Sequence, residues 1–144
     1  GGKEDLYMEV ITRAMARHRA GMEAALAAGG DDLGGQLRAA ARWLLEQPPV
    51  NISRLFRSDV PAIGGRHAEE LVYLLKDSLF APIGRAMMAA YERGEVRLTH
   101  AMVSAVSFVA IIDALHEVHR YANVPLAALA SDTVDTLLDG LRRR

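Results

Sequence analysis

Residues 102–110 read MVSAVSFVA, a stretch whose apolar side chains would surround the axis of a helix on nearly every side. A helix at a protein surface needs only one apolar stripe, so other helices have to cover this stretch almost completely. Elsewhere alanine is abundant, and no segment alternates apolar with polar residues over the length of a strand. The sequence therefore predicts an all-α fold in which helices pack on helices.

Glycine and proline divide the chain into six predicted helices. We expect these helices at about residues 3–28, 33–47, 51–58, 66–93, 99–121 and 125–141. The breaks between them arise because glycine accepts the left-handed conformation that closes a helix, and because proline cannot continue the hydrogen-bond ladder. Asp31 or Asp32 should cap the second helix, and Thr99 the fifth. Pro82 lies inside the fourth and longest helix, where it predicts a kink near Ser78.

The size and charge of the chain limit its function. A chain of 144 residues is long enough for one domain and too short for two ordinary ones, so we expect residues 1–144 to form a single domain. Its 17 Lys and Arg residues against 18 Asp and Glu residues give a net charge of −1, without the basic surplus typical of proteins that bind nucleic-acid phosphates. There is no cysteine, no apolar run of roughly 20 residues and no signal segment. We expect a cytoplasmic protein that does not bind DNA by itself and does not enter membranes.

The last two predicted helices carry more apolar surface than one packing seam requires. The final helix spreads apolar side chains over about half of its circumference, at about 100° per residue. Small side chains along the fifth helix would allow a second helix to approach closely. We therefore predict a homodimer through these two helices, although a monomer with a central fifth helix is the alternative. The predicted interface comprises Val103, Ser107, Ala110, Ala114, Leu126, Val134, Leu138 and Leu141.

His18 is the candidate polar group of a ligand pocket. Helical spacing places it on the apolar face of the first helix, between Met15 and Met22. A buried imidazole needs a hydrogen-bonding partner, which is either a main-chain carbonyl in a packed core or a bound molecule. Large apolar side chains and a tyrosine from the other helices would complete a pocket for a lipophilic or aromatic molecule. The predicted ligand-binding residues are Met15, His18, Met22, Trp43, Phe56, Tyr73, Phe80 and Phe108.

The remaining titratable cluster does not predict catalysis. Asp113, His116, Glu117 and His119 lie close in sequence, but the two histidines do not have the His-Glu-x-x-His spacing, and no second cluster accompanies them. The chain also lacks a nucleophile elbow, a phosphate-binding loop, a cysteine nucleophile and the repeated Glu-x-x-His pairs of di-iron bundles. We predict no enzymatic activity, no cofactor and no metal site. A helical enzyme that uses His116 or His18 is the least favoured alternative.

Three segments in a fixed order resemble the regulatory domains of TetR-family transcriptional regulators. Residues 1–7, GGKEDLY, resemble the junction at which the DNA-reading helix-turn-helix of that family ends and the first regulatory helix begins. Residues 92–97, ERGEVR, resemble the family's turn between its longest helix and its first dimer helix. Residues 134–142, VDTLLDGLR, look like its usual final helix. The resemblance spans the whole chain, but the DNA-binding domain itself is absent from it.

This resemblance implies a particular architecture and function. It implies a six-helix effector-binding and dimerization domain whose last two helices form a four-helix bundle with those of a second copy. A small molecule would enter a cavity framed by the first, second and fourth helices and tilt the first helix. The regulator, a repressor in this reading, would then release DNA, which it contacts only through the missing domain. The alternative function is an all-helical dimerization or protein-interaction module without a small-molecule ligand.

Overall fold

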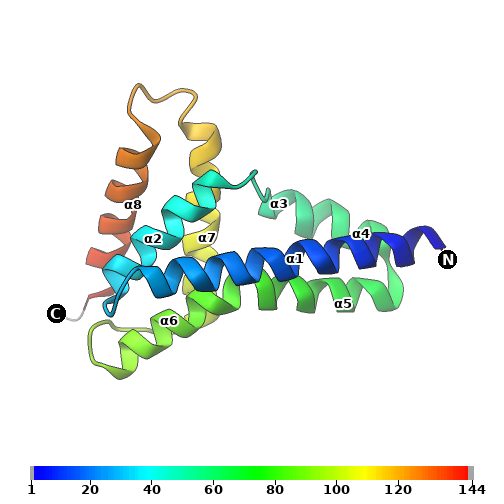
Figure 1. Cartoon of the computed structure of the whole chain (residues 1–144), viewed down its shortest axis with the longest axis horizontal. Coiled ribbons are helices and arrows are strands. Elements are labelled where there is room, and N and C mark those ends of the chain that lie inside the picture. Colours follow the sequence, from blue (N-terminus) through cyan, green and yellow to red (C-terminus); the bar gives the residue numbers. More distant parts are fainter. Residues whose placement is uncertain (1, 143–144) are drawn as a thin grey trace.

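The computed structural model describes residues 2–142, and it confirms the predicted all-α fold (Figure 1). The described residues form six continuous helical segments, two of which contain an internal π-helical stretch. One stretch spans Leu55–Asp59, between α3 and α4, and the other spans Lys76–Phe80, between α5 and α6. The helices are α1 (Gly2–Ala28), α2 (Leu33–Glu46), α3 (Ile52–Arg54), α4 (Val60–Ile63), α5 (Gly65–Leu75), α6 (Ala81–Glu92), α7 (Ala101–Val118) and α8 (Leu126–Leu141).

Most helix ends lie where the glycines and prolines predict them. Asp32 caps α2, because its carboxylate oxygen accepts a hydrogen bond from the backbone N–H of Gly35 at 2.7 Å. The prediction that Thr99 caps the fifth helix was wrong. His100 adopts the extended backbone of an N-cap, and its Nδ1 accepts a hydrogen bond from the N–H of Val103. The predicted end of the third helix at residue 58 was also wrong, because the chain stays helical to Ile63.

The irregularity predicted before Pro82 is present as the π-helical stretch Lys76–Phe80. Proline has no N–H to donate and its ring crowds the preceding turn, so a wider turn relieves the clash. At its end, the N–H of Ala81 donates to the carbonyl of Lys76, five residues earlier. The helix axis changes direction between α5 and α6 (Figure 1).

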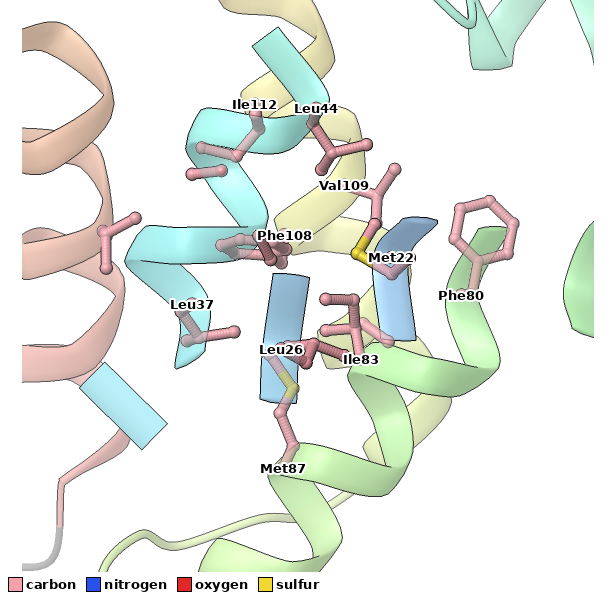
Figure 2. Close-up of a cluster of buried hydrophobic side chains, with 14 of the residues drawn as sticks. Met22, Leu26, Leu37, Leu44, Phe80, Ile83, Met87, Phe108, Val109 and Ile112 are labelled. Atoms are coloured by element: carbon pink, nitrogen blue, oxygen red, sulfur yellow. The ribbon is translucent and has the colours of Figure 1, made fainter. Parts of the chain in front are cut away.

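The hydrophobic core lies where α1, α2, α6 and α7 meet. Figure 2 shows Met22 and Leu26 of α1 facing Leu37 of α2, Ile83 of α6 and Phe108 of α7. From the other side, α8 packs against α2, and its buried side chains are Ala130, Val134 and Leu138. The first half of α1 extends away from this core beside α5 (Figure 1). A long helix therefore leaves the core and continues toward the N-terminal end of the described chain.

Candidate functional site

A cavity of about 540 Å³ opens beside the core, between α1, the end of α2 and α5. Its volume falls in the range of about 300–1,000 Å³ that is typical of small-molecule sites. Its walls are mostly aliphatic, and a tryptophan, a histidine, two prolines, an arginine and a glutamine complete them. The lining residues are Ile11, Ala14, Met15, Arg17, His18, Trp43, Gln47, Pro48, Pro49, Val50, Leu55 and Leu75.

Local sequence explains how these side chains reach one place. Ile11, Met15 and His18 are spaced so that they share one face of α1. Trp43 stands in the last turns of α2, which ends at Glu46 because two prolines follow closely. The connection of residues 48–51 then leads to α3, and we call it the wall of the cavity because Pro48, Pro49 and Val50 line the cavity.

His18 has no hydrogen-bonding partner for its buried Nε2 atom among the described residues. Its ring lies edge-on to the Trp43 indole, with ring centroids 4.9 Å apart and an interplanar angle of 70°. Burial lowers the pKa of the imidazole, because the charged form loses its hydration. His18 is therefore neutral at pH 7, and one of its ring nitrogens donates a hydrogen bond while the other accepts one. The alternative considered for this residue, a core histidine bonded to a main-chain carbonyl, is therefore not met at Nε2.

Gly21 allows Trp43 to lie directly against the backbone of α1. A Cβ atom added at Gly21 would overlap the indole, with Cε2 only 2.7 Å away. Trp43 can therefore reach the cavity and contact His18, one helical turn from Gly21. A glycine inside a helical pattern is the sequence signal for such a close approach, and our sequence analysis did not use it.

The eight predicted ligand-binding residues are divided between cavity, core and surface. Met15, His18 and Trp43 line the cavity together. Met22, Phe80 and Phe108 are fully buried in the neighbouring core. Phe56 is half-buried and stacks on Phe80 at 6.3 Å between centroids, whereas Tyr73 is 72% exposed on α5. The sequence analysis did not anticipate the 48–50 wall, Leu55 or Leu75.

The predicted interface residues likewise fall into three groups. Val134 and Leu138 of α8 are buried within the chain's own fold, Leu126, Leu141 and Ala110 are half-buried, and Val103, Ser107 and Ala114 are exposed. The exposed members belong to a larger set at helical spacing, which we call the α7 face: Val103, Ser107, Ile111, Ala114 and Val118.

The α7 face is apolar and open. Val103 is 58% exposed and Val118 is 46% exposed. The hydroxyl of Ser107 donates to the carbonyl of Val103 at 2.8 Å, so this polar group already has a partner within the helix. Within the described chain, α7 is also the one helix that is long and apolar enough to cross a membrane by length and composition alone, and 28% of it is buried. One face of an apolar helix therefore remains exposed in the described chain.

Asp113 of α7 accepts two hydrogen bonds from the wall of the cavity. Its Oδ1 atom accepts from the N–H of Val50 at 2.8 Å, and its Oδ2 atom accepts from the N–H of Asn51 at 3.0 Å. Glu117, one turn further along α7, pairs instead with Arg120 at 3.5 Å. The residues described contain no group of three or more His, Cys, Asp or Glu side chains that could hold a metal ion.

A second, shallower pocket lies at the start of α1. It has a volume of about 480 Å³ and is lined by residues of α1, α3, α4 and the π-helical stretch between the last two, including Tyr7, Asp59 and Ile63. Burial, followed by the negative charge of Asp59, raises the pKa of the Tyr7 hydroxyl. Leu6 and Val10 stand exposed on the same helix.

Comparison of the chain with protein-family models, curated proteins and solved structures gave no match. The features of the chain that bear on its function are the sequence motifs, the cavity beside α1 and the exposed α7 face.

Proposed function

We propose that this chain is the ligand-sensing and homodimerization domain of a transcriptional regulator similar to the TetR family. The observations that carry the proposal are the cavity of about 540 Å³, which His18 of α1 helps to line, and the buried Nε2 atom of the same side chain, which has no partner among the described residues. In a closed apolar core, an unpartnered nitrogen costs about 1–3 kcal/mol of stability, and a bound molecule that supplies the missing hydrogen bond removes this cost.

The chemistry of the walls defines the class of ligand. Most of the lining is aliphatic or aromatic, so most of the ligand surface should be apolar. His18 is neutral, so it favours an uncharged hydroxyl or carbonyl group over an ion. The proposed effector is an uncharged lipophilic or aromatic molecule with one hydrogen-bonding group.

The position of the cavity gives the mechanism of the response. Ile11, Met15 and His18 all belong to α1, whose first residues form the motif that resembles the junction with a DNA-reading domain. A ligand that binds better when α1 is displaced shifts the population toward that arrangement. In a dimer, the displacement would change the distance between two DNA-reading domains, and operator affinity would fall.

The α7 face supports the dimeric part of the proposal. An exposed apolar strip with its single hydroxyl already bonded is suited to burial against an identical strip, and isologous pairing is the commonest arrangement of homodimers. The same face alone would also fit the alternative function, a dimerization or protein-interaction module without a ligand. The two functions differ in whether the cavity binds a molecule.

Calorimetric titration with 2-naphthol and naphthalene tests the ligand-sensing function. These probes share an apolar body and differ by one hydroxyl group. The wild type should bind 2-naphthol roughly tenfold more tightly than naphthalene. This factor corresponds to a net hydrogen bond of about 1 kcal/mol or slightly more. His18→Leu should abolish this preference and keep the binding of naphthalene. If the wild type binds neither probe, the module without a ligand becomes the better description.

A further inference from the structure

We infer that Asp113 is a latch that holds the cavity wall formed by residues 48–51 against α7, and so links occupancy of the cavity to the α7 face. The latch itself follows from the fold, whereas its role in ligand response rests on the proposed function. Asp113 does not line the cavity, so it acts as a positioning residue.

Both backbone donors of the wall depend on this one side chain. Pro48 and Pro49 have no N–H group, so Val50 and Asn51 carry the first main-chain donors of the connection. The N–H groups of Val50 and Asn51 both donate to the carboxylate of Asp113, one to each oxygen. Hydrogen bonds to a charged carboxylate are stronger than those between neutral groups. The main-chain donors of the wall are therefore both held by a single residue of another helix.

The wall also contains the one non-glycine residue with a left-handed backbone among residues 2–142. Asn51 has φ 56° and ψ 63°, a conformation that side-chain-bearing residues rarely adopt, although asparagine tolerates it best. Such a conformation persists where the surroundings hold it in place. Here the bond from Asn51 to Asp113 supplies that restraint. Once this bond is lost, the connection can relax toward ordinary backbone angles.

The latch joins the two surfaces that the proposed function requires. Pro48, Pro49 and Val50 line the cavity, while Asp113 lies on α7, the helix that also carries the α7 face. A molecule that fills the cavity presses on the wall, and the wall is bonded to the helix that would pair in a dimer. Coupling of this kind is reciprocal, so dimer pairing would also change the affinity for the ligand.

Amide hydrogen exchange in the unliganded protein tests the latch directly. In the wild type, the amides of Val50 and Asn51 should be protected. In Asp113→Ala, the exchange of both amides should be faster by at least about tenfold. The local opening that exposes these amides no longer has to break their two hydrogen bonds to Asp113. The indole N–H signal of Trp43 should also shift. The matched control is Glu117→Ala, which removes a carboxylate from the same helix without touching the wall, and it should leave both amides protected.

Asp113→Asn provides a second variant in case the alanine variant does not fold. Its side chain keeps one acceptor oxygen, so protection should be lost at one of the two amides and retained at the other. Unchanged protection of both amides in a folded Asp113 variant, or equal loss in Glu117→Ala, would overturn the inference.

The link to the ligand is measured by titration with 2-naphthol. Asp113→Ala should bind this probe roughly tenfold more weakly than the wild type, because the wall is no longer preorganised. Sedimentation with and without the probe should show a shift in the dimer dissociation constant of the wild type, and Asp113→Ala should show none. A wild type that does not bind 2-naphthol would contradict the proposed ligand class, while the exchange result would still decide the latch. An equal shift in both proteins would refute the coupling.

Discussion

Replacing Gly21 with alanine should push Trp43 away from the backbone of α1. The added methyl group would overlap the indole ring, which therefore has to move into the cavity or out of contact with His18. Overpacking of this kind costs about 1–3 kcal/mol, and the better helix propensity of alanine returns about 1 kcal/mol. The net result should be a loss of stability of up to about 2 kcal/mol.

Gly84→Ala is the matched control for this prediction. Gly84 also lies within a helix, but its added Cβ atom would meet only Ala105 Cβ at 3.8 Å and the Ala101 carbonyl oxygen at 4.0 Å, which are ordinary contacts. This variant should gain about 0.5–1 kcal/mol from helix propensity alone. Urea unfolding gives both stabilities, and Trp43 is the single tryptophan, so its fluorescence reports the displacement. If Gly21→Ala and Gly84→Ala stabilise the protein equally and leave the Trp43 fluorescence unchanged, Gly21 is not needed for the close approach of Trp43.

Three further predictions address the dimer, the titration of His18 and DNA. Val103→Glu on the α7 face should convert the dimer into monomers, as measured by sedimentation. The control Val10→Glu changes a valine that is 60% exposed on α1 and should leave the dimer intact. A wild type that is monomeric at tens of micromolar would contradict the α7 interface. Burial lowers the folded-state pKa of His18, so the unfolded chain binds more protons and wild-type stability should fall as pH drops below roughly 6.5. His18→Leu should flatten this part of the wild-type curve, and parallel curves would exclude His18 as the cause. Finally, this chain alone should not retard duplex DNA in a low-salt mobility shift, given its net charge of −1, and sequence-specific retardation would refute the domain assignment.

The sequence predicted those features of the fold that neighbouring residues determine. The prolines and glycines located most helix ends, and Pro82 located the irregularity in the longest helix, because each acts on its own backbone. The choice between Thr99 and His100 as a cap was beyond this reasoning. It depends on the path of the chain into α7, where His100 has the extended backbone and the accepting ring nitrogen.

The cavity was only partly predictable, because its shape depends on how separate segments cross. Helical spacing placed His18 on the face of α1 that turns toward the protein interior. It could not tell which residues of that face line the cavity and which belong to the core. Met22 lies one turn beyond His18 and is completely buried. The hydrogen bonds of Asp113 join residues 62 and 63 positions apart and end on backbone atoms. No side-chain pattern encodes such a contact, so the sequence showed Asp113 only as a member of a titratable cluster.

The placement of His18 favours a binding site over a module that only dimerizes. The α7 face could pair two copies whatever residue occupied position 18, and a leucine there would avoid a buried nitrogen without a protein partner. Gly21 adds to this argument, since a helical glycine costs about 1 kcal/mol relative to alanine and its effect here is to bring Trp43 beside His18. The close approach of Trp43 offsets the helix-propensity cost of Gly21, so it is the buried nitrogen of His18 that lowers the stability of the unliganded fold at this cavity. A molecule that bonds to His18 and contacts Trp43 would recover part of that free energy, and it would do so on α1, the helix proposed to carry the response toward DNA.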